Sequence, residues 1–133
     1  MADRAFFDTN VLIYAVVKDD PRGAKAEALL AGGGVLSVQV LNEFVSVARR
    51  KFRMPWPEMK EALAASRVLW SPPVPITLDI HETALGIAER YGYGFYDALI
   101  IAAALRAQCA VLYSEDLKGD QIIDGRLTIR NPF

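Results

Sequence analysis

The sequence has 1 cysteine and 1 histidine among its 133 residues. A single cysteine, Cys109, excludes an internal disulfide framework and is typical of a reducing cytoplasm, so we expect it to be a small buried residue. A histidine-rich zinc site is impossible, and a Ser-His-Asp triad would depend on His81 alone. His81 lies at the start of an expected helix, where a surface position is favoured. The two scarce residue types therefore argue against zinc chemistry and histidine-based catalysis.

Other patterns are also missing. No run of about 18 apolar residues could span a membrane, and the N-terminus lacks the pattern of a signal peptide. The triplet Gly32-Gly33-Gly34 lacks the lysine of a phosphate-binding loop. With 15 basic and 16 acidic residues the formal net charge is −1, so nucleic acid could bind only through a local basic patch. We expect a cytoplasmic protein that folds as one domain over residues 1–133.

Short and long apolar segments alternate along the chain. The short runs predict strands at residues 4–7, 35–38, 76–78, 110–113 and 127–129. The longer segments predict helices at residues 11–17, 22–30, 39–52, 58–70, 79–90 and 96–108. Asp79 is the expected cap of the fifth helix, and residues 117–125 are expected to form a loop. This alternation predicts a three-layer α/β fold, in which a parallel sheet of about four to five strands has helices on both faces.

Acidic residues accompany the ends of the expected strands. Asp8 ends the first strand, and Asp116 follows the strand at residues 110–113. Asp97 opens the helix before that strand, and Glu43 lies about one turn into the helix after the second strand. Parallel strands carry their carboxyl ends at one edge, where α/β folds bind ligands, so all four acids can converge there. Without a cation they would repel one another, and such oxygen ligands suit Mg²⁺ or Mn²⁺.

Two of these acids also have plain structural interpretations. Asp97 lies in a first helical turn, where the helix dipole stabilises an acid whatever its function. Glu43 could be a solvated helix residue, although its neighbours Phe44 and Val45 are apolar and favour a place at the edge of the buried stripe. The residues alone leave both interpretations open.

Two surface features bear on binding. The helix at residues 39–52 ends in a basic cluster that could contact phosphate groups or merely complement the helix dipole, and its members are Arg49, Arg50, Lys51 and Arg53. The helices between residues 21 and 70 are rich in apolar residues and include Trp56 and Trp70 beside prolines. A domain of this size can leave part of that surface exposed, so we expect self-association and a protein partner.

The motifs around the acids match a known family. In chain order they are Phe7-Asp8-Thr9-Asn10-Val11-Leu12, Asn42-Glu43-Phe44, Tyr96-Asp97-Ala98-Leu99-Ile100 and Leu112-Tyr113-Ser114-Glu115-Asp116-Leu117. With these segments the chain resembles the PIN-domain nucleases, and within them the VapC-type toxins of bacterial toxin–antitoxin pairs. The closing Asn131-Pro132-Phe133 is similar to the ending of one subgroup. The resemblance extends over nearly the whole chain.

The resemblance implies a Mg²⁺- or Mn²⁺-dependent endoribonuclease that hydrolyses RNA phosphodiester bonds. The catalytic and metal-binding residues that it implies are Asp8, Glu43, Asp97 and Asp116. Its implied polar supports are Thr9, Asn10, Ser114 and Glu115. Either Glu115 or Asp120 could also share or replace the role of Asp116. Members of this family commonly form homodimers and are inhibited by an antitoxin protein that docks beside the site.

Two other functions stay open at this point. One is a Mg²⁺-dependent phosphoacceptor domain of the receiver type, which shares the size and the clustered acids. Receivers, however, carry paired acids after the first strand and a lysine after the last, where this sequence has Asp8-Thr9-Asn10 and Arg130-Asn131. The other is an inactive PIN fold that acts only as a binding module. Four mutually repelling carboxylates argue against a mere scaffold.

Overall fold

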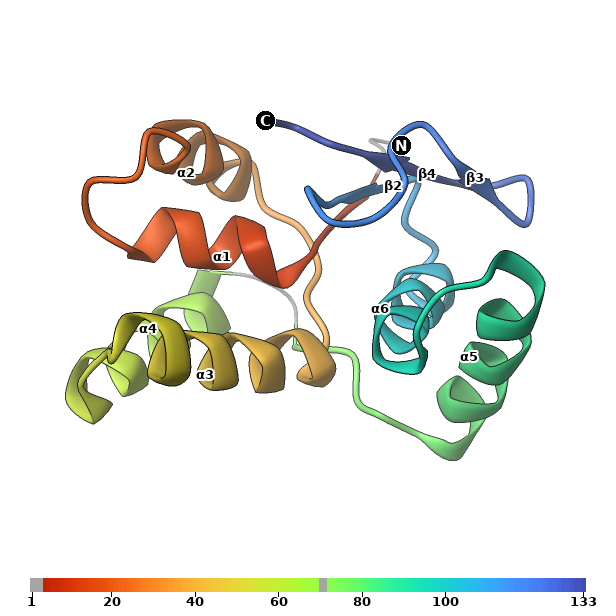
Figure 1. Cartoon of the computed structure of the whole chain (residues 1–133), viewed down its shortest axis with the longest axis horizontal. Helices are drawn as coiled ribbons and strands as arrows, with labels where there is room; N and C mark the ends of the chain where they lie inside the picture. The colour runs from red at the N-terminus through yellow and green to blue at the C-terminus, as the bar shows by residue number, and fades with distance from the viewer. Residues whose placement is uncertain (1–3, 70–71) are drawn as a thin grey trace.

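The computed structural model describes residues 4–69 and 72–133, and Figure 1 shows how its elements are arranged. Its four-stranded sheet has the order β1 (Ala5–Phe7), β2 (Val111–Tyr113), β4 (Leu127–Arg130) and β3 (Ile122–Ile123). The β1–β2 and β2–β4 pairs are parallel, whereas β3 pairs with β4 in antiparallel fashion. The predicted parallel sheet is therefore confirmed for its three main strands. The short β3 adds an antiparallel edge inside a segment that the sequence predicts to be a loop.

In the described part of the chain, six helices complete the α/β fold, and their bounds differ from the predicted ones by at most two residues. They are α1 (Thr9–Val16), α2 (Gly23–Ala31), α3 (Val38–Phe52), α4 (Trp56–Leu69), α5 (Leu78–Tyr91) and α6 (Phe95–Arg106). The predicted end of α4, Trp70, lies outside the described residues. In Figure 1, α5 and α6 pack against each other on one side, and α1 to α4 form the other side. The α/β fold class is thus confirmed.

Two predicted strands, at residues 35–38 and 76–78, are wrong. Val35 forms only an isolated parallel bridge to Phe6, and Ser37 forms another to Val74. The chain then turns into α3, because the Ser37 hydroxyl caps that helix by accepting a hydrogen bond from the Val40 amide at 3.2 Å.

The second error has the same cause. Thr77 is the cap of α5, with its hydroxyl accepting from the Ile80 amide at 3.2 Å, so Leu78 is already helical. The predicted cap, Asp79, lies in the first turn instead. In both segments a short apolar run next to a hydroxyl residue starts a helix, because the cap satisfies a backbone donor that a short strand would leave free.

Gly34 allows the chain to pass close to β1. A Cβ atom at Gly34 would lie 2.3 Å from Cε2 of Phe7 and 2.8 Å from the carbonyl oxygen of Ala5. The amide of Val35 donates to that same Ala5 oxygen at 2.9 Å. Only glycine fits this approach. The close passage brings the start of α3, and with it Glu43, toward the carboxyl edge of the sheet.

The helix α6 forms the centre of the core. Its residues 98–105 are all buried, as expected for a helix that is apolar on every side. The chain then reaches β2 through Cys109, which is buried as predicted, and Leu112, which is fully buried. His81 lies exposed on α5, also as predicted. Within the described residues, no helix is both long and apolar enough to cross a membrane.

Candidate active site

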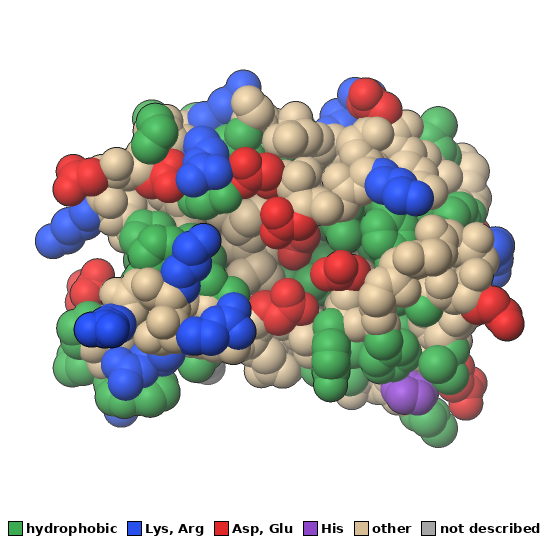
Figure 2. All heavy atoms as spheres, viewed as in Figure 1, with side chains coloured by type: hydrophobic (Ala, Val, Ile, Leu, Met, Phe, Trp, Pro, Cys, Tyr) green, Lys and Arg blue, Asp and Glu red, His purple; other side chains and the backbone are tan. Residues whose placement is uncertain are grey.

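The structure brings the four predicted acids to one pocket at the carboxyl edge of β1 and β2. Its volume is about 190 Å³, and its lining includes Asp8, Glu43, Asp97 and Asp116. Figure 2 shows acidic side chains gathered around a hollow in the middle of one face of the molecule. We call the part formed by Asp8 and Asp116 the strand half, and the part formed by Glu43 and Asp97 the helix half.

Asp8 is the most deeply buried of the four acids, at 4% exposure. It follows β1 directly and caps α1, with Oδ1 accepting from the Thr9 amide at 2.7 Å. Its Oδ2 accepts from the Ser114 hydroxyl at 2.7 Å. Burial raises the pKa of Asp8 to about 6; the two hydrogen bonds oppose this shift, and the charges of Glu43 and Asp97 add to it.

Sheet register explains why Ser114 meets Asp8. Phe7 pairs with Tyr113 across β1 and β2, so the residues that follow each strand are neighbours. The buried Ser114 hydroxyl donates to Asp8 and accepts from the amides of Asp116 and Leu117, each at 3.2 Å. Ser114 thereby fixes the acid after β1 and the loop after β2 at the same time.

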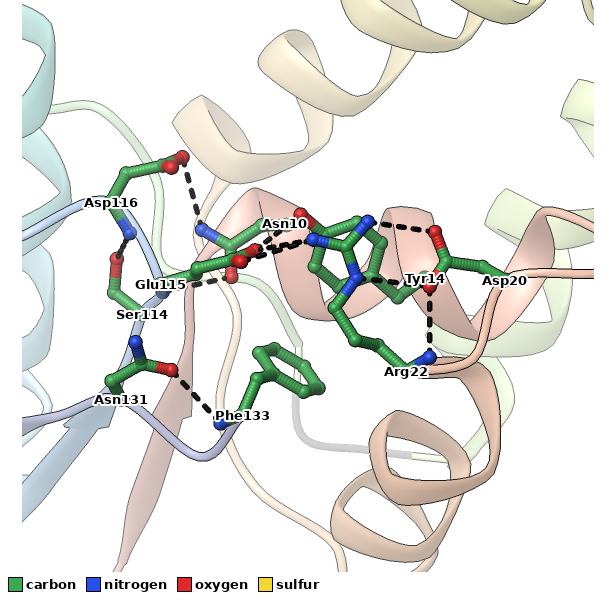
Figure 3. Close-up of polar contacts among 9 residues, drawn as sticks. All are labelled: Asn10, Tyr14, Asp20, Arg22, Ser114, Glu115, Asp116, Asn131 and Phe133. Atoms are coloured by element: carbon green, nitrogen blue, oxygen red, sulfur yellow. Dashed lines mark hydrogen bonds and ion pairs between the residues drawn. The ribbon is translucent and has the colours of Figure 1, made fainter.

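Asn10 forms a second link between these segments. Its Nδ2 donates to Oδ2 of Asp116 at 3.2 Å, and its Oδ1 accepts from the Glu115 amide at 3.2 Å (Figure 3). Asp116 is exposed and lines the pocket. Asn10 holds its carboxylate, and Ser114 holds its backbone amide. Both carboxylates of the strand half are therefore held by hydrogen bonds.

Glu115 turns away from the pocket and does not line it. Its carboxylate accepts from the Tyr14 hydroxyl and from Nη1 of Arg22, at 3.0 and 3.2 Å in the latter case (Figure 3). The Arg22 guanidinium lies 3.7 Å from the centre of the Tyr14 ring and also pairs with Asp20 at 2.9 Å. Phe133 packs edge-on against Tyr14, with ring centres 5.1 Å apart. This group anchors the loop that carries Asp116.

Asp120, the other alternative to Asp116, does not line the pocket either. Its side chain is 88% exposed and lies 3.6 Å from Nη1 of Arg130. Asp116 is therefore the acid of this loop that reaches the pocket.

The helix half is held by fewer contacts. Glu43 is half-buried, and its Oε2 accepts from Nε2 of Gln39 at 3.0 Å. Burial raises the pKa of Glu43, and the charges of Asp97 and Asp116 raise it further, against the Gln39 hydrogen bond. Burial and the charge of Asp116 also raise the pKa of Asp97. Asp97 makes no side-chain hydrogen bond to another described residue.

The pocket contains the oxygen donors that a cation site needs, but these donors are too far apart to coordinate one ion together. Within residues 4–69 and 72–133, no three carboxylate, histidine or cysteine side chains are close enough to form a ready-made metal site. The acids instead stand around the pocket and raise one another's pKa values. The buried hydroxyl of Thr9, in the same lining, has no hydrogen-bond partner among the described residues. Oxygen donors of this kind suit a hard divalent cation.

The predicted basic cluster divides into two pairs. Lys51 lines the acid pocket, and Arg50 lines the groove next to it. Arg49 instead donates to the Met54 carbonyl at 2.7 Å, and Arg53 caps α3 in the left-handed region with φ 51°. Figure 2 shows the lysines and arginines grouped beside the acidic hollow. Two cations are thus placed to meet phosphate groups near the acids, and two serve the end of the helix.

Several residues of this site could not be singled out from the sequence. Tyr14 and Arg22 contact Glu115 from a distant segment of the chain, and Asp20 pairs with Arg22. No sequence motif indicates these contacts. One signal was available for Tyr14, because it lies four residues after Asn10 and so on the same face of α1.

The PIN domain family matches residues 5–122 of the chain. No curated protein matches its sequence. Among solved structures it is similar to a toxin–antitoxin complex from Klebsiella pneumoniae, with a TM-score of 0.72, 21% identity and coverage of 97% of this chain and 98% of that one. It is also similar to VapBC2 from Rickettsia felis, bound to a DNA fragment from its promoter, with a TM-score of 0.66 and 19% identity; the match covers 96% of this chain and 98% of that one. A third similar structure is VapC20 from Mycobacterium tuberculosis, a toxin that cleaves the sarcin–ricin loop. Its TM-score is 0.65 at 22% identity, and the match covers 84% of this chain and 89% of that one. These similarities support the fold.

Proposed function

The chain belongs to the PIN domain family, and we propose that it is a metal-dependent endoribonuclease that acts as the toxin of a toxin–antitoxin pair. The observation that carries the proposal is the convergence of four acids from distant segments in one pocket, beside the basic end of α3. A protein has no structural need for such a cluster, because each carboxylate destabilises the charged form of the others. Metal-dependent hydrolysis of a phosphodiester bond accounts for the cluster of four acids.

A divalent cation fits the pocket by the chemistry of its donors. Carboxylates, the Thr9 hydroxyl and the Asn10 amide line it, and hard oxygen donors suit Mg²⁺ or Mn²⁺ rather than zinc. We propose that the residues holding the ion are Asp8, Glu43, Asp97 and Asp116. When bound, such an ion lowers the pKa of a water ligand and screens the charge of the phosphate.

The chain's own side chains account for the remaining requirements of hydrolysis. Asp8, with a pKa of about 6, is mostly ionised at neutral pH and is fixed by Ser114. Asp97 lines the pocket and its carboxylate accepts no hydrogen bond from another described residue, so we propose that it orients the attacking water. Lys51 and Arg50 attract the phosphate backbone toward the acids. No histidine or covalent nucleophile is needed.

The geometry disfavours the phosphoacceptor alternative. Asp8 is not available as the phosphoacceptor, because it is 4% exposed and both of its oxygens accept hydrogen bonds. The last strand also ends in Arg130-Asn131, where a receiver carries a lysine. The inactive binding module is disfavoured by the intact set of four acids around one pocket.

We further propose that residues 1–133 act as a single domain in the cytoplasm, as a homodimer that an antitoxin protein inhibits. The similarity to two toxin–antitoxin complexes supports the partner. Exposed apolar side chains support an interface: in the predicted region Phe52 is 37% and Trp56 52% exposed, and outside it Leu78 reaches 72%. Trp70, also predicted to contribute, lies outside the described residues. Sedimentation of the protein alone and after co-expression with a candidate antitoxin tests both associations, and a monomer that binds no antitoxin would contradict them.

Cleavage of cellular RNA by the purified protein tests the proposed activity. We expect cleavage with Mg²⁺ or Mn²⁺, no cleavage with chelator, and loss of cleavage in Asp97→Asn. The matched control is Asp79→Asn, because Asp79 lies in the first turn of α5 as Asp97 does in α6, but pairs with Arg106 at 2.7 Å away from the pocket. Metal-independent cleavage, or equal loss in both variants, would contradict the proposal.

A further inference from the structure

The loop that carries Asp116 has a second attachment besides the contacts of Glu115. Just after Asp116 the loop makes a tight turn, in which the Gln121 amide donates to the Lys118 carbonyl at 3.4 Å. The hydroxyl of Tyr93 contacts both ends of this turn. It donates to Oε1 of Gln121 and accepts from the Lys118 amide at 3.4 Å. One side chain from a different part of the chain therefore holds the loop that follows β2.

Tyr93 belongs to the segment that starts the helix of Asp97. Only residues 92–94 separate α5 from α6, and Figure 1 shows this turn next to the β3 end of the sheet. Gly92 ends α5, and Gly94 is the cap of α6. Tyr93 lies between the two glycines, four residues before Asp97. Because α5 and α6 pack against each other, a turn this short moves with α6 and with the acid in its first turn.

The acids on the two sides of this contact repel each other. Burial raises the pKa of Asp97, and the charge of Asp116 raises it further. Burial also raises the pKa of Tyr93; the Lys118 amide opposes this shift, and the charge of Asp97 adds to it. The Tyr93 hydroxyl therefore lies near Asp97 as well as in contact with the loop of Asp116. Repulsion favours a loop that moves away from α6, and the contacts of Tyr93 oppose that movement.

We infer that Tyr93 is a positioning residue for the proposed cation site, because its hydroxyl ties the loop that follows Asp116 to the turn before Asp97. The contact keeps these two acids near each other although they repel when no cation is bound. Tyr93 does not line the acid pocket, so it acts only through the two segments that it joins. The inference rests on the proposed function and deepens it by naming what holds two of the proposed ligands together.

The same part of the chain offers a matched control. Tyr91 lies two residues before Tyr93 and is half-buried as Tyr93 is. Its hydroxyl makes the same kinds of contact, donating to Oδ1 of Asp124 at 3.1 Å and accepting from the Asp124 amide at 3.0 Å. Asp124 lies in the turn between β3 and β4 and does not line the acid pocket. Removing either hydroxyl should cost the fold a similar amount, but only the loss of the Tyr93 hydroxyl should affect the acids.

Equilibrium binding of Mn²⁺ to the purified protein at neutral pH, followed by electron paramagnetic resonance of the free ion, tests the inference without RNA. We expect Tyr93→Phe, which keeps the ring, to raise the Kd for Mn²⁺ roughly fivefold, the effect of losing one ordinary hydrogen bond. Gln121→Met removes the acceptor from the other side of the contact and should raise the Kd by a similar factor. Tyr91→Phe should stay within about twofold of the parent, as for a substitution away from the site.

Combining the two substitutions shows whether they act through one contact. The double variant Tyr93→Phe/Gln121→Met should bind Mn²⁺ as tightly as Tyr93→Phe alone, because both changes remove the same hydrogen bond. Thermal melts in chelator report the fold of each variant, and Gln121→Met keeps the test valid if Tyr93→Phe unfolds. In RNA cleavage, Tyr93→Phe should need more Mg²⁺ for half-maximal activity but reach the rate of the parent at saturation. A general loss of structure would not produce that split.

Three results would overturn the inference. Tyr93→Phe could bind Mn²⁺ as tightly as the parent, or Tyr91→Phe could weaken binding by the same factor. The effects of Tyr93→Phe and Gln121→Met could also multiply in the double variant, which would show that they share no contact. Mn²⁺ binding that depends on Tyr93 in a parent that cleaves no RNA would contradict the proposed nuclease but not the role of Tyr93. Cleavage with the same Mg²⁺ requirement in the parent and Tyr93→Phe would contradict the role of Tyr93 alone.

Discussion

The two halves of the acid pocket are built in different ways. In the strand half, Asp8 accepts two hydrogen bonds and Asp116 is held through Asn10 and Ser114. In the helix half, Glu43 has one side-chain partner, and Asp97 has none among the described residues. One half is thus fixed before any cation binds, and the other consists of acids on helices that repel one another. The contrast fits a pocket that has oxygen donors suited to a cation but, among the described residues, no ready-made metal site.

This difference separates the roles of the acids. A rigid strand half orients a ligand at little entropic cost, because its side chains are already ordered. A loosely held helix half stores repulsion that a bound cation relieves. We therefore expect substitutions in the strand half to damage the fold as well as the activity. Substitutions in the helix half should reduce activity and spare the fold.

The largest loss of stability is expected for Ser114→Ala. This change removes a donor to Asp8 and an acceptor for the amides of Asp116 and Leu117; the Asp8 and Leu117 contacts are buried, and the Asp116 contact is partly buried. Leaving such groups unsatisfied should cost about 3 kcal/mol of unfolding free energy. Denaturant unfolding in chelator measures the loss. If Ser114→Ala were as stable as the parent, the strand half would not be the ordered half.

The next effect concerns the dependence of stability on pH. Burial raises the pKa of Asp8 from 3.8 to about 6 in the folded protein, so the folded state binds its proton more tightly than the unfolded chain does. The stabilisation from Asp8 is therefore fully present below about pH 4 and is lost as the pH rises through about 6, by about 2 to 3 kcal/mol. Glu43 and Asp97, whose pKa values are also raised, act in the same direction.

Denaturant unfolding of the parent and Asp8→Asn in chelator, between pH 4 and 7, isolates this contribution. Carboxylates outside the pocket affect both proteins alike, so the difference between the two curves reports Asp8 together with its coupling to Glu43 and Asp97. We expect Asp8→Asn to gain stability relative to the parent as the pH rises. Parallel curves would show that Asp8 is not held in the environment described.

A smaller effect is expected at the anchor of the strand half. Arg22→Met removes the ion pair to Glu115 and loosens the loop that carries Asp116. The Mg²⁺ concentration for half-maximal RNA cleavage should rise about tenfold, the lower end of the range for outer-shell partners of metal ligands. Arg90→Met is the matched control, because Arg90 also pairs with an aspartate, Asp124, at 2.7 Å on the surface. Equal Mg²⁺ requirements in the two variants would show that the anchor does not position Asp116.

The strand half could be predicted from sequence more fully than its surroundings. Asp8 and Asp116 follow apolar runs that form the parallel strands β1 and β2, and parallel pairing alone brings their ends together. The α6 helix was equally predictable, because its apolar residues continue without a break over residues 98–105, which is about two turns. Glu43 could be placed only in outline, since its distance from the sheet depends on the close passage at Gly34.

Other features could not be predicted from the chain alone. The segments around Val35 and Ile76 are apolar enough for strands, but capping by Ser37 and Thr77 turns each into the start of a helix. Glu115 and Asp116 are adjacent acids, and only the contacts of Glu115 with Tyr14 and Arg22 show which one faces the pocket. Such choices depend on long-range contacts that no local pattern encodes.

Thermal melts of the parent and Asp97→Asn, each in chelator and in millimolar Mg²⁺, test the central claim most directly, which is that the four acids share one cation site. Asp97→Asn keeps the shape of the side chain and removes one repelling charge, so in chelator it should be as stable as the parent or more stable, by up to about 1 kcal/mol. Mg²⁺ should stabilise the parent more than the variant, because only a bound ion shifts the folding equilibrium by mass action. Asp79→Asn, the matched first-turn variant, should respond to Mg²⁺ as the parent does. An Asp97→Asn protein that melts lower in chelator and gains as much from Mg²⁺ as the parent would contradict the claim.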